Sequence, residues 1–562
     1  MKKAASGLFL FVFILLLVKT AESQLVTTGG HAFLEYQEFH HNIKVKFERI
    51  APSYLTDSTY TDSTGYYNKE LEAGVYTLIF TKPGYLDQQI PGIPIYQDTI
   101  LIDQTLVTIG LYGELTGQIS AGIYKVGGNI FVPFNETLII EPGTILKFQQ
   151  NVMFEVFGEL RAEGTLDDSI RFTRYDEGIN WKGIDFKENS SDLSVLEYCV
   201  IEYSNDRGIS VFGCSPLITN SLIQYNSHTT NTDGQEEVFG GGAGICLKNS
   251  NTMVKNVVVS NNSGVTIGCG IYCSNGQPHI SNSLITSNTN PMAWNDMRPG
   301  GGIQCSYDVD LIIENCVICY NINSIGGGIC LAGFQEIFSP KVSVTNSVIY
   351  ENSVQGEYSF GGGIATFNET ELSVHHSTFW NNIGGNISCD DPWLGVNVTV
   401  NNNMDSCDAY ENIRFDPLFT APSDGDFSLA SESPCIDAGN NDFVTSETDF
   451  VYNYRIWDGN FDNDSIVDMG AFEYSSQLFP LGIAINNSNH LTDVILYPNP
   501  SDKMINIVSD DFLNAEIFDL SGKKVLSFDR KSVDISSLPC SFYIVKIQER
   551  NTGFKTQKFI KR

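Results

Sequence analysis

The stretch "NCVICYNINSIGGGIC" (residues 315–330) decides the fold, because its pattern returns in "NSVIYENSVQGEYSFGGGIA" (residues 346–365). Both stretches carry an Asn, an aliphatic residue three positions later, a second Asn six positions after the first, and a Gly-Ile step further on. Units headed by Asn or His in this way recur at Asn220/Asn226, Asn256/Asn262, Asn282/Asn288, Asn315/Asn321, Asn346/Asn352 and His376/Asn382. They begin 26 to 36 residues apart, which is about the length of one coil of a solenoid.

Two strands of each coil can be placed from this pattern. The residue after the first Asn is small in nearly every unit and shares a strand face with the residue two positions further on, so this face packs inward. The Gly-Ile step opens another strand at Ile209, Ile245, Ile271, Ile303, Ile329 and Ile364. Coils stack at about 4.8 Å, so the first Asn of each unit can pass amide hydrogen bonds along the stack and satisfy turn backbone groups. The residues of this structural ladder are Asn220, Asn256, Asn282, Asn315 and Asn346. The sequence predicts a right-handed parallel β-helix.

Short strands punctuated by Gly precede the repeats, at "TLIIEPGTILKF" (137–148), "GELRAEGT" (158–165), "IRFT" (170–173) and "WKGIDF" (181–186). They resemble the first coils of pectate-lyase-like β-helices, and "YCVIEYS" (198–204) is a degenerate early unit of the ladder. We therefore expect the β-helix to occupy residues 111–410.

Residues 411–480 follow, with "SPCIDAG" (433–439) and "DMGAFE" (468–473) near their ends. These motifs resemble the C-terminal cap of secreted β-helix proteins that carry interchangeable anchors, and such a cap is expected to cover the last coil and block its strand edge. Five residues are spaced like oxygen ligands for calcium: Asp458, Asn460, Asp462, Asp464 and Asp468. Only part of an EF-hand pattern is present, since the sixth position is Asn463 and the twelfth is Met469. The stretch can therefore be interpreted either as a structural calcium site or as a solvated acidic turn.

The two ends of the chain predict export. Residues 1–23 read as a cleaved signal peptide, with Lys2 and Lys3 before an apolar stretch, and no other membrane span follows. After a linker (481–493), residues 494–562 carry "YPNP" (497–500), "DLSGK" (519–523) and "FYIVK" (542–546). They resemble the C-terminal sorting domain of the type IX secretion system of Bacteroidetes, although Ser541 stands where that family usually has Gly. The resemblance implies type IX machinery as a partner, passage across the outer membrane, and an extracellular or cell-surface location.

Residues 24–110 form a separate unit. Alternating strands split by Gly65, Gly74 and Gly84 resemble the carboxypeptidase-regulatory-like sandwich, which in secreted chains is usually a spacer or a binding module. The fold class expected for the whole chain is thus all-β, with a right-handed parallel β-helix flanked by N-terminal and C-terminal β-sandwich domains.

Charge and cysteine content narrow the range of partners. The formal net charge is −33 with no compensating basic patch, so nucleic acid is excluded as a partner. The same charge disfavours polyanionic glycans unless a divalent cation bridges them, and neutral glycans or proteins are easier ligands. Of the 13 Cys, Cys273 and Cys305 occupy equivalent positions in successive coils, where either a disulfide or buried thiols would fit.

A search for catalytic residues gives no row of carboxylates beside a Lys or Arg base. The best candidate site is the turn edge after the second Asn, where long connections alternate with short ones and could wall a groove. Its aromatic residues could stack on sugar rings while the charged residues bind hydroxyls. The candidates are Asp233, Glu236, Trp294, Asp296, Arg298 and Tyr358. Tolerated insertions on a solenoid edge would look the same.

We therefore expect extracellular or cell-surface binding of a polysaccharide without catalysis. The alternative is a polysaccharide lyase or glycoside hydrolase acting at the long-loop edge, and a third is a purely structural or adhesive protein. Convergence of Asp233, Glu236, Asp296 and Arg298 would favour the enzyme.

Overall fold

The computed structural model describes residues 25–35, 39–107, 110–228, 241–264, 268–290, 300–333, 339–357 and 359–477, and 495–497, 503–508, 512–519, 524–539, 541–549 and 553–561 of the C-terminal domain. These residues are rich in β-strand and include two short 3-10 helices, η1 (Pro422–Asp424) and η2 (Asn441–Phe443). Neither described helix has the length or apolarity that a membrane span needs. One compact unit comprises the described residues up to Gly110 with Ser120–Lys125, and the other comprises Leu111–Ile119 and the described residues from Val126 onward.

The first unit packs two sheets around one core. In one sheet, β1 (Leu25–Leu34) pairs with the antiparallel strand β4 (Tyr66–Glu72) and with the parallel strands β7 (Thr99–Ile100) and β8 (Gln104–Leu106). The other sheet is antiparallel, in the order β3 (Leu55–Tyr60), β2 (Lys44–Ala51), β5 (Gly74–Thr81) and β6 (Gln88–Ile95). Alternate residues of both sheets point into the core, among them Phe47, Tyr67 and Phe80. The expected N-terminal β domain is confirmed, and its likeness to carboxypeptidase-regulatory-like domains stays a prediction.

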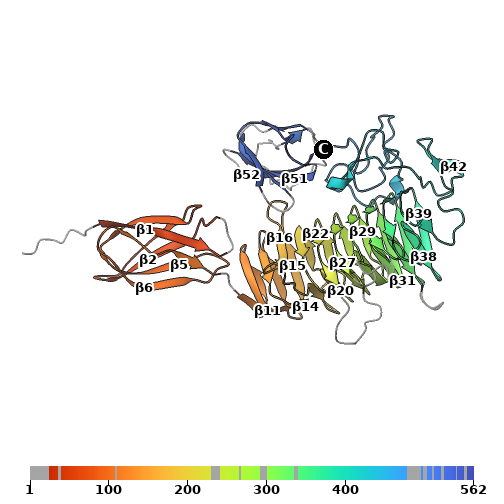
Figure 1. The fold of residues 1–562 in the computed structure, drawn as a ribbon. Helices are drawn as coiled ribbons and strands as arrows, with labels where there is room; N and C mark the ends of the chain where they lie inside the picture. Colours follow the sequence, from red (N-terminus) through yellow and green to blue (C-terminus); the bar gives the residue numbers. More distant parts are fainter. Residues whose placement is uncertain are drawn as a thin grey trace, which may run out of the picture. The chain divides into compact units, whose positions relative to one another are not determined.

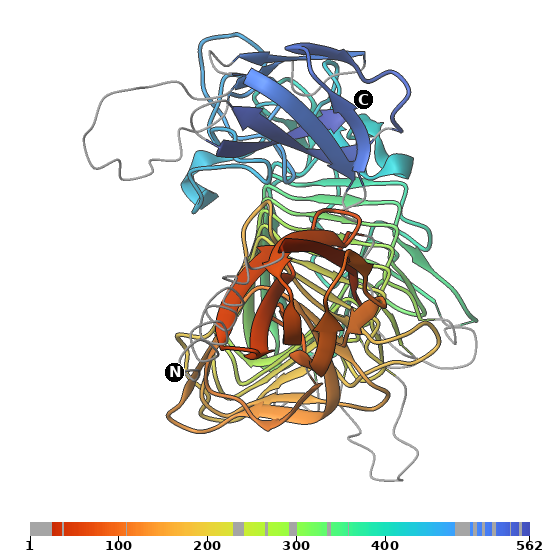
Figure 2. The same cartoon turned by 90° about the vertical axis from the view of Figure 1, so that its left-hand side faces the viewer.

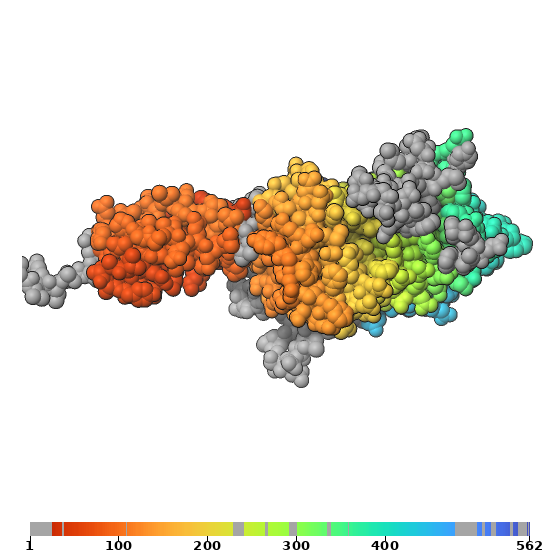
Figure 3. Space-filling model, turned by 90° about the horizontal axis from the view of Figure 1, so that it is seen from below, coloured from red at the N-terminus to blue at the C-terminus, as the bar shows by residue number. Residues whose placement is uncertain are grey.

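The second unit is built on a network of 29 strands that runs from β9 (Gly110–Glu114) to β41 (Ile387–Ser388). Successive coils follow one another in sequence order along one axis (Figures 1 and 3), and Figure 2 looks along that axis at coils lying one behind another. The predicted fold class, an all-β chain with a parallel β-helix and flanking β domains, is confirmed.

Each regular coil contributes one strand to each of three parallel faces. The first face holds β11 (Ile123–Val132), β14 (Phe154–Val156), β17 (Ile184–Phe186), β20 (Ile209–Phe212), β24 (Ile245–Lys248), β28 (Ile271–Gly276), the start of β31 (Ile303–Glu314), β34 (Ile329–Ala332), β38 (Ile364–Phe367) and β41. The second holds β10 (Gly117–Ile119), β12 (Thr137–Ile140), β15 (Glu159–Glu163), β18 (Val195–Glu197), β21 (Leu217–Thr219), β25 (Met253–Lys255), β29 (His279–Ser281), the end of β31, β35 (Lys341–Thr345) and β39 (Glu371–His375).

The third face lies between the two Asn positions of each unit. It holds β13 (Ile145–Phe148), β16 (Ile170–Arg174), β19 (Cys199–Glu202), β22 (Leu222–Gln224), β26 (Val258–Ser260), β30 (Leu284–Thr286), β32 (Val317–Cys319), β36 (Val348–Tyr350) and β40 (Thr378–Trp380). Two-residue strands continue the coils beyond it, pairing β23 (Ser227–His228) with β27 (Ser263–Gly264) and β33 (Ile322–Asn323) with β37 (Ser353–Val354).

Aligned apolar columns fill the interior of the solenoid. The Gly-Ile residues pair with one another coil by coil, from Ile209 to Ile364, and each is fully buried. On the third face a second inward column is formed by Phe172, Ile201, Ile223, Val259, Ile285, Ile318, Ile349 and Phe379. Because identical pleat positions stack directly, each apolar residue is covered by its counterparts above and below.

The second Asn of each unit forms a continuous buried ladder of amides, from Asn226 through Asn262, Asn288, Asn321 and Asn352 to Asn382. From Asn262 onward, the Oδ1 of each Asn accepts from both the backbone N–H and the Nδ2 of the Asn one coil earlier, at 2.9–3.1 Å. Each Nδ2 also donates to a strand carbonyl of the coil before. The repeat therefore satisfies this turn by itself.

Beyond the last coil the chain turns back along the outside of the solenoid. Ile413 still pairs with Thr378, and the returning segment, residues 416–477, follows with β44 (Phe419–Ala421), η1, β45 (Asp426–Leu429) and η2. Before it, β42 (Thr399–Val400) and β43 (Ser406–Cys407) form a small hairpin. The cap expected across the last coil thus extends along the third face, where its apolar residues cover Leu284, Val317 and Val348.

The C-terminal domain has two antiparallel sheets. One orders β46 (Ile495–Tyr497), β47 (Met504–Val508) and β50 (Ser532–Asp534). The other orders β49 (Lys524–Phe528), β48 (Phe512–Asp519), β51 (Ser541–Glu549) and β52 (Gly553–Lys561). Ile505, Ile517 and Val545 belong to their shared core, which confirms the expected C-terminal β domain.

Candidate functional site

The six residues expected at the long-loop edge, Asp233, Glu236, Trp294, Asp296, Arg298 and Tyr358, lie outside the described residues. At the start of the first long connection the structure does place His228, whose Nδ1 lies 3.1 Å from Oδ1 of Asp206. Arg207 Nη2 lies 3.5 Å from His228 Nε2. Burial alone would raise the pKa of the Asp206 carboxyl, but the hydrogen bond with His228 and the Arg207 charge outweigh it and hold that pKa below its usual value. This edge therefore carries a charged His-Asp-Arg cluster at its base.

A groove lies on the outer side of the third face, where two columns of outward residues cross the strands. One column runs through Arg171, Val200, Leu222, Val258, Leu284, Val317, Val348 and Thr378, and the other through Thr173, Glu202, Gln224, Ser260, Thr286, Cys319, Tyr350 and Trp380. The returning segment packs on the later coils, so only the earlier part of each column lines the groove. Phe427, Phe450 and Val451 of that segment form the facing wall.

Glu202 organises the polar end of the groove. Its Oε1 accepts from Arg171 Nη1 at 2.7 Å and from Thr173 Oγ1 at 3.0 Å, and its Oε2 accepts from Gln224 Nε2 at 3.0 Å. The Glu202 side chain is only 4% exposed. Because both of its oxygens are occupied, Glu202 orients Arg171 and Gln224 rather than offering a free carboxylate.

A row of residues at the ends of the third-face strands takes one residue from each coil: Arg174, Tyr203, Tyr225, Asn261, Ser287, Tyr320 and Glu351. We call it the turn row; its members from Tyr203 to Glu351 line the groove, and Arg174 lies just outside it against the Tyr203 ring. All but Arg174 have a positive φ. The rings of Tyr203 and Tyr225 stack at 5.5 Å with an interplanar angle of 7°, and the Arg174 guanidinium lies 3.9 Å above the centroid of Tyr203. Tyr225 remains 47% exposed. The row thus places one polar side chain on each coil, at intervals of about 4.8 Å, along the apolar groove.

The returning segment follows the first Asn of successive units, which forms the other border of the groove. Asn346 accepts from the Asn440 backbone N–H at 2.8 Å and donates to the Asn440 carbonyl at 3.0 Å. Asn282 donates to the Thr448 carbonyl at 2.7 Å, and the Tyr452 hydroxyl donates to Asn220 at 2.6 Å. Of the amide ladder predicted for these first Asn residues, the structure shows one bond along the stack, from Asn256 to Asn220 at 3.2 Å. The other members bond to the returning segment instead. Asn315, with its amide oxygen turned toward Arg455, accepts from Nε at 3.3 Å.

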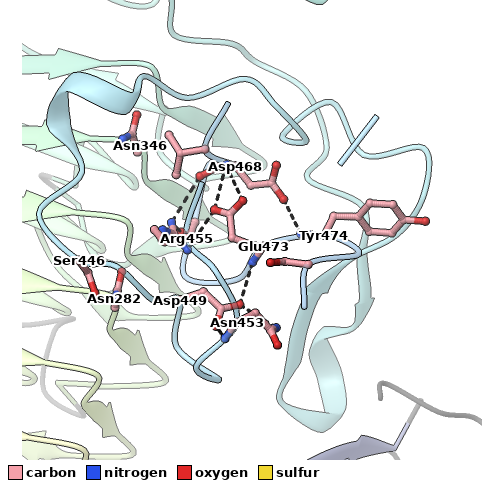
Figure 4. Close-up of polar contacts among 12 residues, drawn as sticks. Asn282, Asn346, Ser446, Asp449, Asn453, Arg455, Asp468, Glu473 and Tyr474 are labelled. Carbon is pink, nitrogen blue, oxygen red and sulfur yellow. Dashed lines mark hydrogen bonds and ion pairs between the residues drawn. The ribbon is translucent and has the colours of Figure 1, made fainter. Parts of the chain in front are cut away.

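Asp449, Arg455, Asp468 and Glu473, the anchor cluster, hold the returning segment together (Figure 4). The Arg455 side chain is fully buried, and its Nη1 lies 3.4 Å from Oε1 of Glu473. Asp449 accepts four hydrogen bonds, from the N–H groups of Val451, Asn453 and Glu473 and from Asn453 Nδ2. Asp468 accepts from the Asp437 and Tyr474 N–H groups. The cluster therefore fixes the turn that carries Phe450, Val451 and Tyr452.

The carboxyl groups of the anchor cluster have strongly raised pKa values. Burial raises the pKa of Asp449 to about 6 and that of Asp468 to about 8, although backbone hydrogen bonds and Arg455 oppose the shift. Burial and the nearby Asp468 charge raise the pKa of Glu473 well above its usual value. Arg455 is the cation of the cluster, facing three buried carboxyl groups.

The residues expected to bind calcium take part in other contacts. Asp458 accepts from the N–H groups of Asp462 and Asn463, Asn460 accepts from Asp462, and Asp462 accepts from Asp464, all in an exposed loop. Asp468 belongs to the anchor cluster instead. In the described part of the chain, no group of three or more His, Cys, Asp or Glu side chains is arranged to hold a metal ion. Calcium therefore stays a prediction.

The cysteines that the structure describes carry free thiols. Cys273 and Cys305 pair in register on adjacent coils, and both are fully buried. Burial raises the pKa of the Cys273 thiol well above its usual value, and the nearby Cys305 adds to the shift. These two thiols fill the solenoid interior as apolar groups.

Sequence reasoning missed the groove. The turn row has a detectable signal, since Tyr225 and Tyr320 both stand five residues after the first Asn of their units, and Tyr203 holds the same place in the degenerate unit. The facing wall has no local signal, because it comes from residues far along the chain.

Comparison with known proteins identifies the C-terminal domain. Residues 495–562 match the family model for the secretion system C-terminal sorting domain. The predicted type IX sorting domain is therefore confirmed, and the chain is exported to the cell surface or the extracellular space.

Other similarities are short. Protein bark beetle of Drosophila melanogaster is 42% identical over 69 residues, which is 12% of this chain and 2% of that protein. Two structures of a type II cohesin-X-dockerin complex from Acetivibrio cellulolyticus align at 24% and 22% identity. They cover 14% and 15% of this chain and 56% and 58% of theirs, each with a TM-score of 0.13. The chain thus spans less than two thirds of these proteins.

Proposed function

We propose that the exported protein binds a linear glycan along the groove of the third face, without altering it chemically. The observation that carries this proposal is the turn row, which sets one side chain per coil beside apolar residues such as Leu222 and Val258. A sugar chain has the matching character, because its rings combine apolar C–H faces with hydroxyl groups at a regular repeat. Tyr225 and Gln224 would bind hydroxyl groups while the apolar column contacts the rings.

The positions of the carboxylates favour binding over hydrolysis. Among the described residues that line the groove, the carboxylates are Glu202 and Glu351, which lie five coils apart. At about 4.8 Å per coil they are about 24 Å apart, whereas paired glycosidase carboxylates lie within about 10 Å of each other. Glu202 is also fully engaged by Arg171, Thr173 and Gln224. This groove therefore lacks the usual two-carboxylate arrangement within the residues described.

A polysaccharide lyase or glycoside hydrolase at the long-loop edge is the competing proposal. The observation that favours it is the contact of His228 with Asp206 and Arg207, since a carboxylate-oriented His is a common general base. Its remaining residues would come from the connections that include Asp233 and Asp296.

A glycan-array screen of the secreted chain tests both proposals. We expect Tyr225→Ala and Gln224→Ala to weaken any hit roughly tenfold, because each removes a contact from the groove. Tyr60→Ala serves as the control, since Tyr60 is 58% exposed on the N-terminal unit. New reducing ends or unsaturated-uronate absorbance that His228→Ala abolishes would instead establish the enzyme. Binding that both groove variants leave unchanged would contradict the proposed site.

A further inference from the structure

The two ends of the turn row carry opposite charges. Arg174 stands at the first coil of the row and Glu351 at the last, with the polar residues Tyr203, Tyr225 and Asn261 next to Arg174. Glu351 accepts a hydrogen bond from Asn381 at 3.1 Å. A ligand lying along the row therefore meets a cation at one end and an anion at the other.

Arg174 differs from the neighbouring Arg171 in having no carboxylate partner among the described residues. Arg171 is neutralised by Glu202 at 2.7 Å, whereas the contact of Arg174 within the described part of the chain is with the Tyr203 ring. Stacking on an aromatic face fixes the plane of a guanidinium but leaves its N–H groups at the edge available. Such a group can bind a carboxylate or sulfate through two parallel hydrogen bonds.

The negative net charge of the protein limits how many anionic groups a bound glycan can carry. With a formal net charge of −33, the protein repels a glycan that carries an anion on every sugar. A single anionic group placed beside Arg174 escapes most of this repulsion, because it meets a local cation at short range. Neutral sugars would then occupy the positions beside Tyr203, Tyr225 and Asn261.

Resting on the proposed glycan-binding function, we propose that Arg174 is the specificity-determining residue of the groove. It selects a sparsely charged glycan whose one carboxylate-bearing or sulfated sugar lies at the Arg174 end, and it thereby fixes the direction in which the chain lies along the solenoid.

The test compares matched oligosaccharides by titration calorimetry with the full-length chain. Three probes share one neutral backbone: one is unmodified, one has a terminal uronic acid and one has a terminal sulfate. We expect at least one charged probe to bind roughly tenfold more tightly than the neutral one, as a charge-assisted pair allows. Arg174→Gln should abolish this preference while leaving the affinity for the neutral probe unchanged. Arg174→Lys should keep part of the preference, because Lys retains the positive charge but lacks the planar guanidinium group.

Arg161→Gln is the matched control, since Arg161 pairs with Glu163 on the second face, away from the groove. Preference for uronate alone or for sulfate alone would identify the source of the anion. Equal affinity for all three probes, or a preference that survives Arg174→Gln in a variant with unchanged melting temperature, would overturn the inference while leaving glycan binding standing. No binding of any probe, combined with silence on the array, would overturn the proposed function and this inference together.

Discussion

The amide side chains at the two Asn positions of each coil find their hydrogen-bond partners in different parts of the chain. The second Asn, as in Asn288, is bonded to its counterparts one coil before and one coil after, and to a strand carbonyl of the solenoid. The first Asn, as in Asn282, adopts a positive φ and directs its amide to a residue of the returning segment. The second Asn residues therefore bond within the repeat. The first Asn residues bond to the returning segment, which lies as far as 232 residues away in sequence.

Because of this difference, the row of second Asn residues has a structural role, whereas the row of first Asn residues lies where a ligand could bind. The ladder of second Asn residues is buried and closed, so it supports the stack but offers nothing to a ligand. The row of first Asn residues borders the groove, and the segment that covers it also supplies the wall residues Phe450 and Val451. Substitutions in the anchor cluster should therefore displace the groove wall and leave the hydrogen bonds between the second Asn residues intact.

Replacing the cation of the anchor cluster should give the largest effect. Arg455→Met leaves the buried carboxyl group of Glu473 without its cation, and breaking such a pair costs about 4 kcal/mol. We expect hydrogen exchange of residues 440–454 to accelerate strongly and glycan binding to weaken, while strands β22 and β26 keep their protection. Arg161→Met, at a half-exposed surface pair, should leave both properties unchanged. Equal loss of protection in the segment and in the ladder would refute the separation of the two edges.

A pair of substitutions compares the two Asn rows directly. Asn288→Ala removes a buried amide that takes part in several hydrogen bonds, so we expect the local stability of the neighbouring coils to fall by about 3 kcal/mol. Asn282→Gly keeps the positive φ accessible and loses one bond to Thr448, for about 1 kcal/mol. Hydrogen exchange of β26 and β30 measures the loss of local stability in each variant. Equal losses in the two variants would contradict the difference between the two Asn rows.

The stability of the returning segment should also depend on pH. Asp449 and Asp468 have pKa values of about 6 and about 8 when folded, against an ordinary value of 3.8. The folded segment therefore binds more protons than the unfolded one, so this contribution to stability is complete below pH 3.8 and is lost as pH rises through 6 to 8. Exchange of residues 440–454, corrected for its intrinsic rate, should be slower at pH 5 than at pH 8. Asp468→Asn should flatten this slope, and a steeper slope in the variant would contradict the assignment.

The sequence predicted those parts of the fold that repeat. The Asn spacing and the Gly-Ile steps placed two strands of each coil, because an equal offset in every unit requires equal geometry in every coil. The C-terminal domain was also predictable, since motifs such as Tyr497 to Pro500 and Phe542 to Lys546 lie close together in sequence.

The groove was not predictable in the same way. Its floor requires knowing which outward residues remain uncovered, and that depends on where Phe427, Met469 and Phe472 of the returning segment pack. Asp468 illustrates the difficulty, because its spacing from Asp458 suggested a calcium ligand, whereas the fold buries it in the anchor cluster with Glu473. Local spacing does not record such long-range contacts.

The most direct test of the account is a hydrogen-exchange footprint of the full-length chain with the best oligosaccharide from the glycan array. We predict new protection at residues 200–204, 222–226 and 258–261, which line the groove on three successive coils. Protection confined to residues 229–240 and 291–299, with the groove unchanged, would contradict the account and place the ligand at the long-loop edge.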